Sequence, residues 1–415
     1  MNTEYLNKLA RLAVLKGVGL QEGQPLIIRS AIEPEMARLA RACAAEAWKA
    51  GAKDVTILWS DPETDKLRYE NAEEKALETA PAWKGVLLED AATDDAAFLT
   101  IDGEDPDLFA DVNPAKMLIS RKALNKITPH YRKGLDAGKL AWSIVAAPST
   151  GWAKKVYPDL SEEEAIEKLW QDIFAISRID ENDPLENWQK HGQSFENRVN
   201  RLNSLNLEKL HYQSANGTDL WVDLPEYSIF VGGSSVLQNG QAIFCNIPTE
   251  EIFTAPKLDG VNGTLEAVMP LSHNGKIIDS FGFTFKDGEA VEWHAREGKD
   301  VLDAIFASAD GANRLGEVAL VDKTSPIRKQ NRIFYNTLFD ENAACHFAFG
   351  QSYAETIENG NFLSEDELKE KGMNQSDIHV DFMVGAEDLT ITGFTRDGKE
   401  IAIFENGSFS PEFDL

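Results

Sequence analysis

The order in which two sequence patterns follow each other along this chain sets the strongest limit on its fold. In the first part of the chain, short β-branched runs alternate with stretches whose apolar residues recur at helical spacing. The runs at residues 24–30 and 53–60 flank a helical stretch that ends at Gly51, which is the pattern of a β-α-β unit. The pattern therefore predicts parallel strands joined by helices.

The same alternation continues to about residue 180. Strand-like runs at residues 96–103 and 139–149 flank a helical stretch at 122–137, and another helix follows the N-cap candidate Ser161. We expect an α/β domain over residues 1–190, with a mainly parallel sheet flanked by helices. No glycine-rich phosphate-binding motif follows these strands, so neither a dinucleotide nor a P-loop nucleotide site is supported.

Beyond about residue 190 the pattern becomes that of antiparallel strands. Short apolar runs are separated by Asn-Gly and Asp-Gly dipeptides, which favour the tight turns of β-hairpins. These dipeptides lie at residues 216–217, 239–240, 262–263, 274–275, 287–288, 397–398 and 406–407. Two helical stretches, at residues 298–312 and 362–372, interrupt the region, and a polar linker is expected at 181–184. We expect a β-rich α+β domain over residues 191–415.

Charge and cysteine content restrict the partners and the compartment. The formal net charge of −28 argues against nucleic acid and anionic membranes, because such a surface repels phosphate groups. No stretch reaches the roughly 18 apolar residues of a membrane span, and the N-terminal segment lacks a signal-peptide core. Cys43, Cys245 and Cys345 are scattered, which argues against a disulfide framework and a thiolate zinc site. We therefore expect a cytoplasmic protein.

Two strand-like segments carry polar residues that suit a metal ion. His379 and Asp381 stand two positions apart in DIHVDFMVG, so their side chains project from one strand face toward a common point. An exposed polar strand face would explain this pair equally well. Glu317 lies at the start of the apolar run VALV, where it either meets a cation or reaches solvent.

Two further segments supply more acids and a second imidazole. FDENAACHFAFGQSY contains acids at residues 340–341, followed by His346 and Tyr353. NIPTEEIFTAP contains Glu250 and Glu251 between apolar residues, so at least one of these carboxylates is expected to point away from solvent. Buried carboxylates are unfavourable unless a positive group meets them.

Taken in order, NIPTEEIFTAP, RLGEVALVD, LFDENAACHFAFGQSY and DIHVDFMVG resemble the metallo-aminopeptidase family typified by aminopeptidases T and S. The similarity extends over the whole chain, although these motifs all lie beyond residue 240. It implies hydrolysis of N-terminal residues from peptides, a broad preference for that residue, and a homodimer. It also implies six metal ligands: Glu251, Glu317, Glu341, His346, His379 and Asp381. Tyr353 matches the family's active-site tyrosine.

The chemistry of this residue set agrees with the resemblance. Four carboxylates and two imidazoles without a thiolate suit Zn²⁺, Co²⁺, Mn²⁺ or Mg²⁺. Six ligands exceed the three that a catalytic zinc takes from a protein, so we expect two divalent ions per chain, sharing Glu317. Tyr353 is expected to donate a hydrogen bond to the developing oxyanion. The adjacent Glu250 leaves open which glutamate ligates and which residue is the general base.

Other functions remain open from the residues alone. A protein that binds metal or peptide without turnover, or a metallohydrolase of another amide, would use the same cluster. No G-x-S-x-G motif occurs, and Cys345 points away from the direction of His346, so a serine or cysteine nucleophile is not supported. The five remaining histidines are expected at the surface: His130, His191, His211, His273 and His294.

Overall fold

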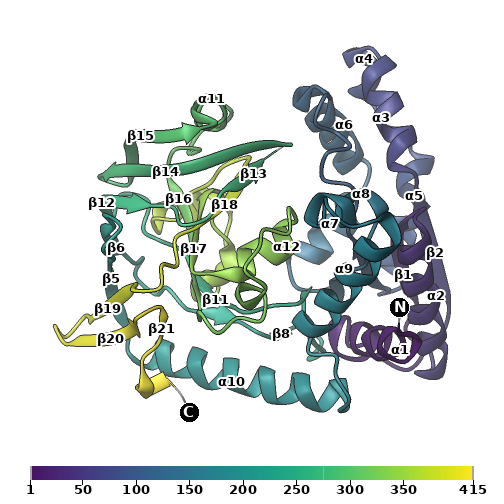
Figure 1. Cartoon of the computed structure of the whole chain (residues 1–415), viewed down its shortest axis with the longest axis horizontal. Helices are drawn as coiled ribbons and strands as arrows, with labels where there is room; N and C mark the ends of the chain where they lie inside the picture. The colour runs from purple at the N-terminus through teal and green to yellow at the C-terminus, as the bar shows by residue number, and fades with distance from the viewer. Residues whose placement is uncertain (1, 274, 414–415) are drawn as a thin grey trace. The chain divides into compact units, whose positions relative to one another are not determined.

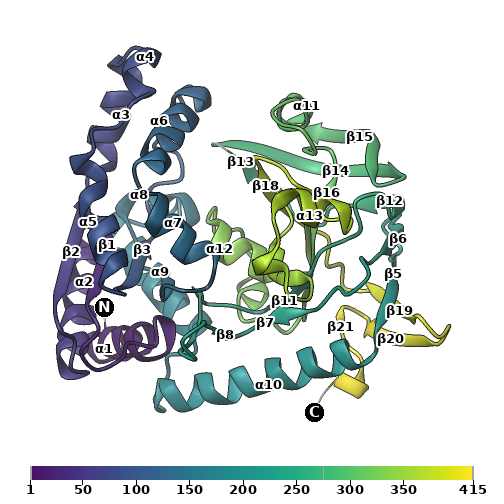
Figure 2. The ribbon, with the colours of Figure 1, turned by 180° about the vertical axis from the view of Figure 1, so that it is seen from behind.

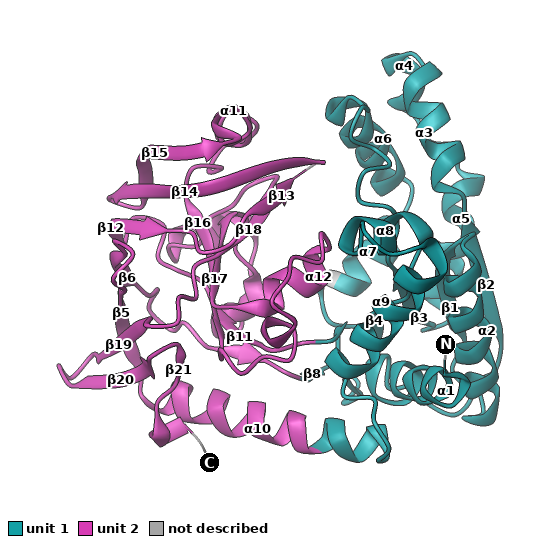
Figure 3. Ribbon diagram, in the orientation of Figure 1, with its two compact units in different colours: residues 1–189, 234–248 teal, residues 190–233, 249–415 magenta. Residues whose placement is uncertain are grey.

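The structure, a computed structural model, describes residues 2–273 and 275–413 and forms two compact units (Figures 1 and 3). Unit 1 comprises Met1–Gln189 and Ser234–Pro248, and unit 2 comprises Lys190–Gly233 and Thr249–Leu415. The return of residues 234–248 to unit 1 differs from the expected division, because β10 (Asn246–Ile247) pairs with a strand of the first sheet. Helix α10 (Pro184–Ser204) begins at the end of the expected linker.

Unit 1 is built on a five-stranded parallel sheet in the order β10-β4-β3-β1-β2. Its longer strands are β1 (Leu26–Ala31), β2 (Val55–Ser60), β3 (Ala97–Asp102) and β4 (Trp142–Ala146). All four overlap the strand-like runs in the sequence, so the predicted α/β class is confirmed for this unit.

Helices cover both faces of this sheet. Ile27 and Phe98 pack with residues of α5 (Trp83–Thr93) and α7 (Pro129–Asp136) on one face. Helix α2 (Pro34–Lys49) packs on the opposite face. It connects β1 to β2 on one side of β1, whereas the chain from β2 to β3 crosses back to the other side of β1. Right-handed crossovers that run in opposite directions along a sheet place their helices on opposite faces.

Two further helical stretches were expected in unit 1, and one of them is divided in the structure. Ser161 caps α9 (Glu162–Ile176) through a capping box with Glu164, as its position before an acidic run predicted. The single helix expected over residues 122–137 is instead two helices, because Pro129 starts a new one. The remaining helices are α1 (Thr3–Leu12), α3 (Pro62–Asn71), α4 (Glu74–Leu77), α6 (Pro114–Lys126) and α8 (Thr150–Val156).

Unit 2 contains two larger antiparallel sheets, whose strands are labelled in Figures 1 and 2 taken together. The first sheet has the order β18-β17-β16-β11-β7. Its strands are β7 (Val231–Gly232), β11 (Glu251–Thr254), β16 (Leu315–Val321), β17 (His346–Gly350) and β18 (His379–Met383). The β-rich class predicted for this region is therefore confirmed.

The second sheet has the order β13-β14-β12-β6-β5-β19-β20-β21, with β15 paired to β14. Its strands are β5 (Leu207–Gln213), β6 (Asp219–Asp223), β12 (Val261–Glu266), β13 (Leu271–His273), β14 (Lys276–Lys286), β15 (Glu289–Glu297), β19 (Thr390–Thr395), β20 (Glu400–Glu405) and β21 (Ser408–Phe409). The helices α11 (Lys299–Phe306), α12 (Thr337–Asp340) and α13 (Glu365–Glu370) interrupt the strands of the unit.

Most of the predicted hairpin turns are present. The dipeptides at 216–217, 287–288, 397–398 and 406–407 join consecutive strands of the second sheet, and 239–240 joins β8 (Ser235–Val236) to β9 (Ala242–Ile243) in unit 1. The dipeptide at 274–275 includes a position outside the described residues.

The turn predicted at Asn262-Gly263 is wrong, because both residues lie inside β12. Gly263 has a φ of 123°, and a Cβ there would lie 2.1 Å from the carbonyl oxygen of Asp219. The glycine therefore permits close approach of two strands and not a turn.

The two sheets of unit 2 share one aromatic core. Phe283 of β14 packs against Phe349 of β17 with ring centroids 4.9 Å apart, and Phe382 of β18 joins them. Because side chains alternate along a strand, the residues between these aromatic positions project from the other face of the first sheet. Among the described residues of the whole chain, no helix is long and apolar enough to cross a bilayer.

Candidate metal centre

Strands β17 and β18 direct three of the predicted site residues to one face. Phe347 of β17 and Phe382 of β18 enter the aromatic core. His346, His379 and Asp381 occupy the alternating positions, so they project from the opposite face. The H-x-D pair therefore lies on a partly buried face of the sheet and not on a solvent-exposed one.

Glu317 and Glu251 reach the same face from β16 and β11. A bulge between Leu315 and Glu317 brings Glu317 opposite Ala348, which in turn lies opposite Asp381. Glu317, Ala348 and Asp381 therefore form one row across three strands. Ala348 therefore lies between the two carboxylates in this row.

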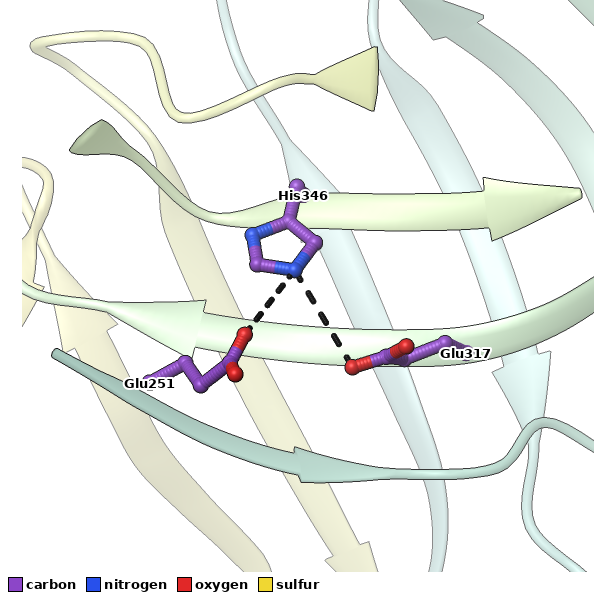
Figure 4. Close-up of side chains that lie close together, drawn as sticks. All are labelled: Glu251, Glu317 and His346. Carbon is purple, nitrogen blue, oxygen red and sulfur yellow. Dashed lines mark ion pairs between the residues drawn. The ribbon is translucent and has the colours of Figure 1, made fainter. Parts of the chain in front are cut away.

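Glu251, Glu317 and His346 form a first group of side chains that converge on one point (Figure 4). Nε2 of His346 lies 3.2 Å from Oε2 of Glu251 and 4.0 Å from Oε1 of Glu317. One ligand atom from each residue lies within 4.8 Å of the others.

A second group consists of Glu317, His379 and Asp381 and satisfies the same 4.8 Å criterion. Nε2 of His379 lies 2.9 Å from Oε2 of Glu317 and 3.2 Å from Oδ1 of Asp381. Glu317, which is 4% exposed, belongs to both groups and offers one oxygen to each histidine.

The second ring nitrogen of each histidine indicates how the ring faces the cluster. Nδ1 of His346 lies 3.2 Å from the carbonyl oxygen of Ala344, and Nδ1 of His379 lies 2.9 Å from the carbonyl oxygen of Gln351. A carbonyl only accepts hydrogen bonds, so each Nδ1 carries a hydrogen. Neutral rings would then direct their Nε2 lone pairs at carboxylate oxygens, which is unfavourable unless a proton or a cation lies between them. The donor set therefore fits divalent cations.

Protons can balance the charge of this cluster when no cation is bound. Burial alone would lower the pKa of His346, but the carboxylates of Glu251 and Glu317 raise it to about 10. Burial raises the pKa of Glu317 despite a hydrogen bond from His379. Burial and the charge of Glu251 raise the pKa of Glu341 well above its ordinary value. Cations entering the cluster would displace these protons, so metal binding should release protons.

Glu341 and Tyr353 lie beside the two groups and belong to neither among the described residues. Glu341 stands on a short 3-10 turn, where Asn342 donates a hydrogen bond to it, and lines a cavity together with His379 and Asp381. The ring of Tyr353 lies 4.8 Å from that of His379. Burial of the phenol and the carboxylates around it raise its pKa, so its hydroxyl stays protonated and can donate.

Glu250 and Asp340, which precede the predicted ligands Glu251 and Glu341 in the sequence, form contacts outside the two groups. The backbone N–H of Glu250 donates to Asn342, and its carboxylate lies 3.8 Å from His191, so it is not part of either group. Asp340 is buried and accepts hydrogen bonds from the backbone N–H groups of Phe334 and Asn336.

Of the five histidines expected at the surface, two are exposed and three are partly buried. His130 and His294 are exposed, whereas His191, His211 and His273 are partly buried. Nε2 of His211 pairs with Asp219 and its ring stacks on Trp221. The sequence pattern did not predict that the backbone carbonyls of Ala344 and Gln351 would contact the two imidazoles, because any residue type can supply a backbone oxygen.

Two groups of imidazole and carboxylate donors that converge on one face of a sheet form the kind of centre found in metal-dependent enzymes. Residues 2–409 match the family described as Thermophilic metalloprotease (M29). The chain belongs to this family of peptidases.

Proteins of known name support the same assignment. The chain is 43% identical over 407 residues to Aminopeptidase 2 of Geobacillus stearothermophilus, with 98% of each chain covered. It is 41% identical over 408 residues to Aminopeptidase AmpS of Bacillus subtilis, covering 98% of this chain and 99% of the relative. The solved structure of wild-type AmpT from Thermus thermophilus matches with a TM-score of 0.90 at 35% identity, covering 98% and 99%. The chain is therefore a metallo-aminopeptidase, a hydrolase that uses a divalent metal cofactor.

Proposed function

We propose that this enzyme removes N-terminal residues from peptides at a centre for two divalent ions. The observation that carries the proposal is the pair of three-residue groups that share Glu317. Their oxygen and imidazole nitrogen donors suit Zn²⁺, Co²⁺, Mn²⁺ or Mg²⁺. The proposed ligands are Glu251, Glu317, His346, His379 and Asp381.

Bound divalent ions would supply an acidified water and polarise the scissile carbonyl. Tyr353 donates a hydrogen bond to the oxyanion that develops on this carbonyl, an interaction worth about 3 kcal/mol in the transition state. The carbonyls of Ala344 and Gln351 hold the two imidazoles in the orientation that keeps Nε2 toward the cluster.

We assign Glu341 to proton transfer and not to ligation. The resemblance to the family implied a ligand at this position, but the side chain lies outside both groups while lining the adjoining cavity. A carboxylate in that position can accept a proton from the attacking water and pass it to the leaving amine. Glu250, which the sequence left open for this role, lies near His191 and lacks that placement.

The charge of the centre favours substrates with a free amino terminus. Four carboxylates face two imidazoles in and beside the cluster, so the acids outnumber the cationic groups that the chain itself provides. An ammonium or a neutral amine finds acceptors there, whereas an acetylated amine loses both its charge and its lone pair.

The test compares two substrates that differ only at the amino terminus. Leucine p-nitroanilide should be hydrolysed by the metal-loaded enzyme, and N-acetyl-leucine p-nitroanilide should be at least about a hundredfold worse in kcat/KM. Peptide digests should shorten one residue at a time and leave products with a common C-terminus. Internal cuts would indicate an endopeptidase, and equal hydrolysis of the acetylated substrate would indicate a general amidase. A loaded protein that binds peptides without consuming them would support the non-catalytic alternative.

We also infer a homodimer in the cytoplasm. The family resemblance supports the dimer, and the three free cysteines fit a reducing compartment: Cys43, Cys245 and Cys345. Sedimentation of the purified protein tests the first inference, and fractionation of the source cells tests the second.

A further inference from the structure

One buried amide side chain connects two parts of the candidate centre. Asn342 is fully buried and follows Glu341 on a 3-10 turn. Its Oδ1 accepts a hydrogen bond of 2.6 Å from the backbone N–H of Glu250, the residue before the proposed ligand Glu251. Its Nδ2 donates to the carbonyl oxygen of Leu338 at 3.0 Å and to Oε1 of Glu341 at 3.3 Å. The oxygen and both N–H groups of this amide are therefore engaged.

The backbone of Asn342 is held as well as its side chain. Its carbonyl oxygen accepts a hydrogen bond of 2.8 Å from Oγ of Ser325, which is 2% exposed and lies on the segment after β16. Oγ of Ser325 in turn accepts from the backbone N–H of Ile327 at 3.2 Å. A buried polar network whose groups are all hydrogen-bonded is rigid. The bonds to Ser325, Leu338 and Glu250 therefore fix the amide independently of the carboxylate of Glu341.

The contact between Asn342 and Glu341 does not arise from the helical turn itself. Adjacent residues on a helical turn point in different directions, so the side chain of Glu341 bends back to accept this bond. No other group in the described part of the chain donates a hydrogen bond to this carboxylate. A neutral N–H on one oxygen favours the ionised form, which is the form that can accept a proton.

We propose that Asn342 is a positioning residue for proton transfer. Its amide holds one oxygen of Glu341 and leaves the other for the attacking water in the cavity that Glu341 lines. The same side chain fixes the backbone next to Glu251. Asn342 acts only through these groups, because its own donors and acceptor are engaged within the chain. The proposal rests on the proton-transfer role assigned to Glu341 above.

The experiment is a double-mutant cycle between positions 342 and 341 in the metal-loaded enzyme. Asn342→Asp keeps the size of the side chain and an acceptor for the N–H of Glu250, but its ionised carboxylate gives Glu341 no donor. With leucine p-nitroanilide, kcat should fall at least about tenfold while KM and metal content stay within about twofold. In the Glu341→Gln background, Asn342→Asp should change kcat by less than about twofold, because the group that it positions is already absent.

Asn203→Asp is the matched control. The amide of Asn203 also accepts from a backbone N–H and donates to a carbonyl oxygen, both of Phe230, and it has no carboxylate partner among the described residues. Its replacement should leave kcat within about twofold of the wild type. Should Asn342→Asp fail to fold, Asn342→Ala goes through the same cycle at saturating metal with the same expectation for kcat.

Two results separate the positioning role from the function on which it rests. An equal loss of kcat in the wild-type and Glu341→Gln backgrounds, or an unchanged kcat in both, overturns the positioning role of Asn342 and leaves the role of Glu341 standing. Loss of metal from the Glu341→Gln single variant overturns the proton-transfer role of Glu341, and the positioning role with it.

Discussion

Tyr353 lies at the edge of the centre: 44% of the residue's surface is exposed, while its hydroxyl end lies among the carboxylates that help to raise its pKa. Tyr353→Phe removes only the hydroxyl, so metal content and fold should be retained while kcat falls by about 10² to 10³, the effect of losing one oxyanion donor. Steady-state kinetics and metal analysis of the same preparation test this. A loss of less than about threefold would limit Tyr353 to packing against Phe253 and His379.

Glu341 and Asp381 are matched carboxylates with different proposed roles. Glu341→Gln should keep the bound metal but lower kcat at least about a hundredfold, because the amide cannot carry the proton. Asp381→Asn should lower metal content as well as rate, since Asp381 belongs to one of the two groups. Both variants are analysed for metal and for kcat. Loss of metal from Glu341→Gln would return this residue to the ligand set that the sequence implied.

At the scale of the elements, one row across β16, β17 and β18 places a small residue between two of the proposed ligands. Ala348 lies between Glu317 and Asp381 and is fully buried. Ala348→Leu places a larger side chain under the site and should reduce metal affinity at least about tenfold. Ala348→Gly, the matched control, should retain the metal and cost about 1 kcal/mol of folding stability.

Equilibrium metal titration and thermal unfolding of the two Ala348 variants provide the measurements. Normal metal affinity in a folded Ala348→Leu protein would show that this row does not limit the space of the site.

At the scale of the whole molecule, metal binding should stabilise unit 2 selectively. Both ligand groups lie in unit 2, and no comparable group occurs among the described residues of unit 1. A ligand that binds only the native state raises the free energy of unfolding by about 2.7 kcal/mol when its concentration is a hundred times its Kd. Removal of the metal also leaves the buried carboxylates without a counter-charge. Exhaustive chelation should abolish activity and increase hydrogen exchange in residues 315–321, 346–350 and 379–383.

The strands of unit 1 at residues 26–31 and 97–102 are the internal control and should keep their protection. Restored activity and protection on adding Zn²⁺, Co²⁺ or Mn²⁺ would complete the test. Undiminished turnover by a verified metal-free sample would refute the metal requirement.

By itself, the sequence determined the elements and the residue types of the site. Periodicity predicted the parallel sheet of unit 1, and turn dipeptides predicted most hairpins of the antiparallel sheets, because both signals depend on local backbone preference. The motifs around Glu251, Glu317, His346 and His379 predicted a set of ligands through their resemblance to the family, and five of the six predicted side chains meet in two groups in the structure.

Only the tertiary structure decided how distant segments combine. The return of residues 234–248 to unit 1 depends on the pairing of β10 with β4, which no local pattern encodes. The bulge before Glu317, the carbonyls that orient the two imidazoles and the placement of Glu341 outside both groups arise from strand register and loop backbone. Register and backbone oxygens are independent of side-chain identity, so the sequence specifies which donors are available while the fold decides which of them meet.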